Sequence, residues 1–212
     1  HPSGFVMQAN NFSTTTFANN SNVLLRSYRL TPTTLTLSQV QGIRGGLTVD
    51  VPLTSSDTNV GTIAASPVNF ASNINAVNGQ FDPTNAGTTE LAISQPLGFE
   101  TPTSGNQSVI ATVTAPAINV TTNLNIGDDL QQAVGASLQS VPPAPVDVTL
   151  TSSDSSVFII SKVATAAGSA SVSYDDVATN SFGTFYLQGL SQGSATLTIS
   201  APGYASTTRT VN

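Results

Sequence analysis

The stretch VDVPLTSSDTNV at residues 49–60 decides the fold, because the chain carries a second version of it, VDVTLTSSDSSV, at residues 146–157. The two copies begin 97 residues apart and agree at nine of twelve positions. In each copy apolar residues alternate with polar ones, which is typical of a half-buried β-strand. The Ser-Ser-Asp that follows offers side chains that hydrogen-bond to nearby backbone groups and start turns. A strand and turn that recur at this spacing predict two copies of one small β-domain.

The composition indicates a folded chain with few charges. Of its 212 residues, 39% are hydrophobic and 8% are charged, which leaves enough apolar surface for a core. The absence of cysteine excludes disulfides and thiolate metal sites. A net charge of −6 with five basic residues argues against nucleic-acid and anionic-membrane partners. No apolar run is long enough to span a bilayer, so membrane insertion is not expected. The abundance of hydroxyl and amide side chains favours an extracellular protein.

Two complete domains are predicted from the spacing of the copies, at residues 31–116 and 117–212. Each is expected to contain about seven short strands broken by turn residues, which is typical of a β-sandwich. Almost no linker separates them at Ala115-Pro116, so a rod-like arrangement is expected. The polar stretch 73–87 is predicted to be a long loop. Residues 128–138 are predicted to be a strand or an irregular edge rather than a helix.

Several strand ends share a further pattern: TFYLQGL at 184–190, GSATLTISAPGY at 193–204 and ATVTAP at 111–116. Together with the Leu-Thr-Ser-Ser-Asp strand ends, they resemble bacterial immunoglobulin-like (Ig-like) repeats. The resemblance covers most of residues 31–212, and it implies tandem Ig-like β-sandwiches strung in arrays on large secreted and surface proteins. Its motifs mark strands and turns and carry no catalytic signature, so it implies a scaffold or adhesive module by analogy of fold.

Residues 1–30 are predicted to be the terminal strands of an incomplete upstream Ig-like unit. Pro2-Ser3-Gly4-Phe5 parallels Pro96-Leu97-Gly98-Phe99, and each is followed by a polar turn and an apolar strand. The first residues have neither the basic start nor the apolar core of a signal peptide, so we expect the natural protein to begin upstream of His1.

The apolar side chains of residues 1–30 need cover, because an isolated hairpin of this size is marginal in water. Three arrangements are open: packing on the chain's own first unit, frayed remnants of an array, or addition of the strands to a sandwich in a neighbouring chain. The candidate inter-subunit contact residues are Phe5, Val6, Met7, Phe12, Phe17, Val23, Leu24 and Leu25.

The residues that carry chemistry do not form a recognisable catalytic motif. His1 is the only histidine, which argues against both a Ser-His-Asp triad and a copper site needing a second imidazole. Asp128-Asp129 and Asp175-Asp176 are candidate Ca²⁺ ligands, but they lack the spacing of a calcium loop, and solvated turn residues are the favoured interpretation. Lys162, the only lysine, is interpreted as a solvated residue at a strand end rather than a covalent cross-link. No cofactor is predicted.

The predicted function is that of a non-enzymatic extracellular structural protein, the building block of a bacterial surface filament or stalk. Assembly is expected through strand or domain contacts between chains, since heterologous contacts repeated head to tail generate fibres. The alternative is an adhesin or carbohydrate-binding segment of a large surface protein, with a glycan or protein ligand. An enzyme has no positive support in the sequence.

Overall fold

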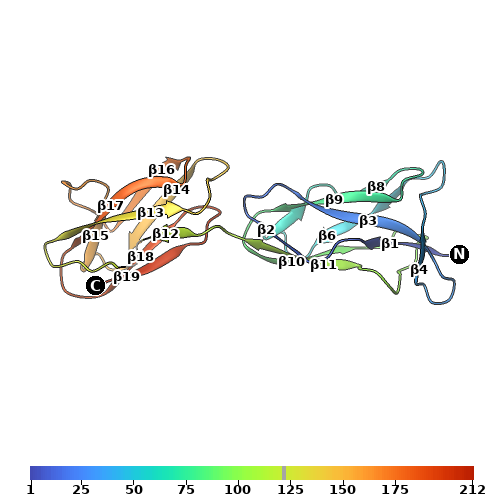
Figure 1. Cartoon of the computed structure of the whole chain (residues 1–212), viewed down its shortest axis with the longest axis horizontal. Coiled ribbons are helices and arrows are strands. Elements are labelled where there is room, and N and C mark those ends of the chain that lie inside the picture. Colours follow the sequence, from blue (N-terminus) through green and yellow to red (C-terminus); the bar gives the residue numbers. More distant parts are fainter. Residues whose placement is uncertain (121–122) are drawn as a thin grey trace. The chain divides into compact units, whose positions relative to one another are not determined.

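The computed structural model describes residues 1–120 and 123–212, and every regular element within them is a β-strand. The strands form two compact units, unit 1 (His1–Thr114) and unit 2 (Ala115–Asn212), most of whose strands are labelled in Figure 1. The predicted all-β fold class is therefore confirmed. Within the described ranges, no helix has the length and hydropathy needed to cross a bilayer.

Unit 1 contains eleven strands, which are β1 (Ser3–Met7), β2 (Phe12–Thr15), β3 (Ser21–Leu30), β4 (Leu37–Val40), β5 (Val49–Val51), β6 (Leu53–Ser55), β7 (Gly61–Ile63), β8 (Val68–Phe70), β9 (Ala76–Pro83), β10 (Gly87–Ile93) and β11 (Ser108–Thr114). One sheet has the order β1-β3-β9-β7, with β4 paired to the C-terminal part of β3. The second sheet has the order β2-β11-β10-β6, and β5 and β8 form a separate two-stranded ribbon. The inward residues of these strands, β4 excepted, form one apolar core.

The first thirty residues are part of unit 1. β1 pairs antiparallel with β3, β3 pairs antiparallel with β9, and β2 pairs in parallel with β11. Phe5, Met7, Val23 and Leu25 from these strands lie in the core and are at most 2% exposed. The structure thus differs from the prediction that residues 1–30 end an absent upstream unit and that a domain starts at residue 31. The physical reason is that β9 and β11 offer these strands pairing edges, and the core of the same unit covers their apolar side chains.

The stretch 73–87, predicted to be a loop, contains β9, which lies between β3 and β7 in the sheet. Asn78-Gly79 suggested a turn, but Gly79 is a close-packed strand residue: a Cβ there would overlap Cδ2 of Leu53. Pro83 is the last residue of the strand, where a missing N–H is tolerated. The loop prediction was therefore wrong. Gly79 is a residue type common in turns, but here its small size makes room for the side chain of Leu53.

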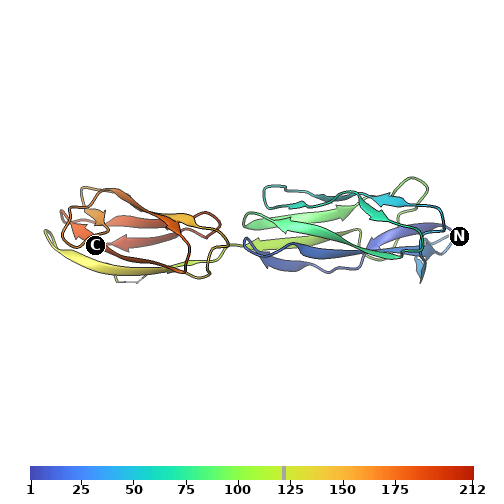
Figure 2. The ribbon, with the colours of Figure 1, turned by 90° about the horizontal axis from the view of Figure 1, so that it is seen from above.

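The described residues of unit 2 form eight strands, which are β12 (Ile118–Val120), β13 (Gln131–Leu138), β14 (Val146–Ser152), β15 (Phe158–Ser161), β16 (Ser171–Val177), β17 (Ser181–Gly189), β18 (Ala195–Ser200) and β19 (Thr207–Val211). They form two four-stranded sheets, β12-β13-β17-β15 and β16-β14-β18-β19. Figure 2 shows the strands of each unit running alongside one another. Phe185 and Leu187 from one sheet and Leu150 and Leu197 from the other are fully buried. The strand β13 confirms the prediction of strand rather than helix for this segment.

The two copies of the duplicated stretch fold differently along their strands. In unit 1 the stretch is split at Pro52: β5 pairs with β8 before it, and β6 pairs with β10 after it. In unit 2 the corresponding residue is Thr149, and β14 continues through it, paired with β16 on one side and β18 on the other. Because proline has no N–H to give to a ladder, its position explains the break.

Candidate functional site

The second aspartate of each duplicated stretch, Asp57 or Asp154, forms a turn. The Oδ1 of Asp57 accepts a hydrogen bond from the backbone N–H of Asn59 at 2.9 Å, and Asp154 accepts one from the N–H of Ser156 at 2.9 Å. The Ser156 hydroxyl also donates to Asp154 Oδ1 at 2.6 Å. This hydroxyl, together with the Ser156 amide, lowers the pKa of Asp154 from its ordinary value. These side chains stabilise turns, so the most repeated part of the sequence is architectural.

The other acidic residues are not gathered into a metal centre. In residues 1–120 and 123–212, no group of three or more His, Cys, Asp or Glu side chains is placed to share an ion. Asp175 accepts a hydrogen bond from the hydroxyl of Ser173 at 2.8 Å, and the carboxylate of Asp147 accepts one from the N–H of Asp176 at 3.1 Å. Asp128 and Asp129 are exposed beside β13. The interpretation of these residues as solvated turn residues, favoured over Ca²⁺ ligands, stays a prediction.

Lys162 lies at the exposed end of β15. Its Nζ donates a hydrogen bond to the backbone oxygen of Ser173 at 2.8 Å and lies 5.3 Å from the ring centroid of Tyr174. Burial, and secondarily the neighbouring Tyr186, raise the pKa of Tyr174. The lysine thus contacts β16 through a carbonyl and an aromatic face.

The eight predicted inter-subunit contact residues lie in and around the core of unit 1. Phe12 is partly exposed, and its ring meets that of Phe81 edge-on at 6.1 Å between centroids. Five of the eight are buried: Phe5, Val6, Met7, Val23 and Leu25. The other three are partly exposed: Phe12, Phe17 and Leu24. Donating these strands to another chain would open the core of unit 1. The structure therefore corrects the strand-donation prediction: of the three arrangements left open, it has the strands packed within their own unit.

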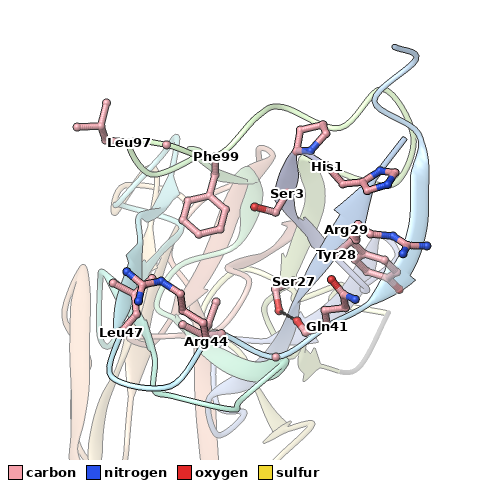
Figure 3. Close-up of a pocket in the computed structure, with 14 residues that line it drawn as sticks. His1, Ser3, Ser27, Tyr28, Arg29, Gln41, Arg44, Leu47, Leu97 and Phe99 are labelled. Carbon is pink, nitrogen blue, oxygen red and sulfur yellow. Dashed lines mark hydrogen bonds between the residues drawn. The ribbon is translucent and has the colours of Figure 1, made fainter. Parts of the chain in front are cut away.

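A groove at one end of unit 1 is the candidate binding site. Its cavity volume is about 640 Å³, and four segments line it: the first three residues, the C-terminal part of β3, the loop at 41–47 and the loop at 97–99. Figure 3 shows Phe99 on one side of the hollow, with Arg44 and Leu47 across from it. The segments are far apart in the sequence, and three pairings bring them together. β1 pairs with β3, the N–H of Gln41 donates to the oxygen of Ser27, and the N–H of Glu100 donates to the oxygen of Ser3.

The wall that carries Phe99 is anchored to the core. The Phe99 ring lies 4.8 Å from that of buried Phe5, tilted by 49°. The Gln95 side chain clasps the Phe5 backbone, accepting from its N–H and donating to its C=O, both at 2.8 Å. The N–H of Glu100 donates to the oxygen of Ser3 at 2.8 Å. The aromatic wall of the groove is thus held in place before any ligand binds.

The opposite wall is fixed at its base and charged at its tip. The Ser27 hydroxyl donates to the backbone oxygen of Gln41 at 2.6 Å, and the N–H of Ile43 donates to the oxygen of Ile74 at 3.0 Å. Ile43 itself is buried, whereas the next residue, Arg44, is exposed. The loop therefore holds one guanidinium at the rim of the groove.

The groove is locally positive in an acidic chain. Arg29 and Arg44 line it, two of the five basic residues of the chain, and none of the fourteen lining residues is Asp or Glu. Arg29 donates through Nη2 to the hydroxyl of Ser38 at 2.9 Å. None of the eleven acidic residues of the chain lines the groove, the nearest in sequence being the exposed Glu100 after Phe99, so the lining itself favours an anion.

Sequence reasoning did not find this groove. One signal was present: Arg26, Arg29 and Arg44 place three of the five basic residues within a short segment. The segment around Phe99 was compared with the segment around Phe5 as a repeat, whereas in the structure the two rings are in contact. Only the fold brings the arginines and the aromatic ring to one place.

No protein-family model matches the chain, and no curated protein matches it. Among solved structures, it is similar to domains 5–6 of the S-layer protein SbsC (14% identity, TM-score 0.35, covering 100% of this chain and 98% of that one). It is also similar to SbsC domains 4 and 5 (17%, 0.31, covering 77% and 75%) and to the Yersinia pseudotuberculosis adhesin InvE (18%, 0.38), of which it spans 58%. The likeness extends only to general β architecture, and the resemblance to Ig-like repeats remains a prediction.

Proposed function

We propose that the chain is a pair of non-enzymatic, load-bearing β-units in an extracellular structural protein, such as a filament or stalk at a bacterial surface. The observation that carries the proposal is a pairing found in both units. In each, a segment near the beginning of the unit runs parallel to the last strand and is hydrogen-bonded to it.

In unit 1 this pairing is a continuous ladder. β2 and β11 are in parallel register over four residue pairs, from Phe12–Ala111 to Thr15–Thr114. The N–H of Thr16 extends it with a bond to the oxygen of Thr114 at 3.0 Å. Asn11 extends it at the other end, because its Oδ1 accepts from the N–H of Ile110 at 2.8 Å. β2, near the beginning of unit 1, and β11, its last strand, are thus joined by both backbone and side-chain bonds.

In unit 2 the described pairing is sparser. Ala117 and Ala205 form a parallel bridge, and the hydroxyl of Thr207 donates to the oxygen of Ile118 at 2.6 Å. Farther along, the N–H of Asn212 donates to the oxygen of Leu124 at 3.0 Å. Ala117 is paired with Ala205 and Leu124 with Asn212, so both segments run in the same direction.

Parallel pairing of the terminal segments determines how a pulling force reaches the hydrogen bonds. Force applied at the two ends of a unit draws these segments in opposite directions along their own axes. The cross-strand bonds are then loaded together, in shear, whereas strands pulled apart from one end would lose their bonds one pair at a time. Units built in this way are suited to transmit tension.

Single-molecule pulling on the 212-residue chain tests the proposal. Unit 1 tethered at its ends, residues 1 and 114, should unfold at clearly higher force than the A86C/T114C variant tethered through its two cysteines. Ala86 and Thr114 lie at the same end of the antiparallel β10–β11 pair, so that tether unzips it. Equal forces in the two geometries, or a lower force along the chain, would refute a load-bearing role.

A further inference from the structure

We propose that the groove of unit 1 binds an acidic saccharide, with the carboxylate held by Arg44 and the sugar ring against Phe99. This binding site goes beyond the load-bearing role, and the two stand or fall separately. The groove volume of about 640 Å³ lies within the usual range of small-molecule sites. Its walls are held by hydrogen bonds and by the contact of Phe99 with Phe5, so little ordering is needed on binding.

The charge of the groove selects an anion. A guanidinium offers paired N–H donors that match a carboxylate, and Arg44 is exposed at the rim. No acidic residue lines the groove, whereas the whole chain carries −6. An anion approaching the chain is therefore repelled by most of the surface and attracted here.

The other lining residues select a saccharide over a simple anion. Phe99 is partly exposed and forms one wall of the hollow, so an apolar ring stands opposite a cation (Figure 3). Leu97 beside it is wholly exposed, which extends the apolar rim. Ser3 and Gln41 add a hydroxyl and an amide that can bond to sugar hydroxyls. An apolar wall, polar groups and a cation in one groove match a sugar ring with its hydroxyls and carboxylate.

The test is a titration of the 212-residue chain with trigalacturonate, followed by calorimetry and by chemical shifts of the groove residues. The matched ligand control is the methyl ester of the same trisaccharide, which keeps the sugar and removes the charges. The variant is Arg44→Gln, and its control is Arg209→Gln, which removes one charge from unit 2. Circular dichroism confirms that both variants are folded.

Trigalacturonate should bind with shifts confined to the groove, and Arg44→Gln should weaken binding at least about tenfold, as expected for loss of a charge-assisted bond. Arg209→Gln should leave the affinity within about twofold, the ester should bind at least about tenfold more weakly, and added salt should lower the affinity. Equal binding of acid and ester, or no effect of Arg44→Gln, would overturn the proposal. So would self-association of the wild-type chain that Arg44→Gln abolishes, because the groove would then hold an acidic surface of a second copy.

Discussion

The two copies of the duplicated stretch share a turn and differ in the strand that precedes it. After the strand, the backbone N–H of Ser56 donates to the backbone oxygen of Glu90 on β10 at 2.9 Å. The backbone N–H of Ser153 donates to the backbone oxygen of Thr196 on β18, also at 2.9 Å. Before it, unit 1 has two short strands where unit 2 has one of seven residues. The turn therefore keeps its geometry although two of the three differences between the copies, Thr58/Ser155 and Asn59/Ser156, lie within it.

The cores of the two units also exchange large and small residues between paired strands. In unit 1, Gly61 on β7 lies under the ring of Phe81 on β9, and a Cβ on the glycine would overlap that ring. In the strand register Gly61 on β7 lies opposite Pro83 on β9. In unit 2, Phe158 on β15 lies opposite Gly189 on β17, so the glycine is on the other strand of the pair. At this pair of strands the buried phenylalanine is on β9 in unit 1 (Phe81) and on β15 in unit 2 (Phe158), so close packing is kept with different residues.

The largest effect is expected from removing the ring of Phe158 from the core of unit 2. Phe158→Ala should lower the free energy of unfolding of unit 2 by about 3–5 kcal/mol, because it leaves a cavity in a close-packed core. Hydrogen exchange resolved by peptide should show faster exchange across β15 and β17 while unit 1 is unchanged. The control Val163→Ala, at a side chain 54% exposed, should have little effect. Loss of protection in both units would show that they do not unfold separately.

The next effect concerns the break at Pro52. Thr149→Pro should destabilise unit 2 by at least about 2 kcal/mol, because it removes an N–H from a strand paired on both sides. The reverse change, Pro52→Thr, should alter unit 1 by no more than about 1 kcal/mol, since a new bond and a more flexible unfolded chain offset each other. Denaturant unfolding measures both variants. A similar cost for the two changes would mean that proline is not the cause of the break.

The sequence predicted what depends on local pattern. The alternation and the Ser-Ser-Asp turn are local, so the all-β class followed from them. The prediction of a strand or irregular edge at 128–138 followed from Gly135 and the β-rich surroundings. The placement of residues 1–30 did not follow, because β2 and β11 are about a hundred residues apart and a parallel pairing leaves no local mark. Gly79 misled for a related reason: its small size serves Leu53, a residue distant in the sequence. The groove depends on three such long-range pairings and was missed entirely.

A smaller effect is expected at the parallel ladder of unit 1. Asn11→Ala removes the acceptor for the N–H of Ile110 and should lower the stability of unit 1 by about 0.5–1.5 kcal/mol. Thr207→Ala removes the corresponding side-chain bond to Ile118 in unit 2 and should act on that unit alone. Thermal unfolding and peptide-resolved exchange of the two variants compare the units. An effect of Asn11→Ala on the stability of unit 2 would contradict the claim that this bond stabilises unit 1 alone.

The smallest effect concerns pH. The pKa of Asp154 is lowered in the folded chain, first by the Ser156 hydroxyl and then by the Ser156 amide. The contribution of the charged carboxylate is therefore present above the ordinary aspartate pKa of about 4, and it is lost as the pH falls through the lowered value. A carboxyl-carbon NMR titration should find the Asp154 pKa below the ordinary value, and Ser156→Ala should move it upward. An unchanged pKa in that variant would reject the hydroxyl as the main cause.

The load-bearing account is tested most directly by stretching the whole chain from residue 1 to residue 212 in a single-molecule experiment. Two unfolding events are predicted, and the event at lower force should belong to unit 2, whose described terminal pairing is sparser than the four-pair ladder of unit 1. Asn11→Ala should lower only the higher force. Unfolding of unit 1 before unit 2, or forces that do not respond to Asn11→Ala, would contradict the claim that the parallel terminal strands carry the load.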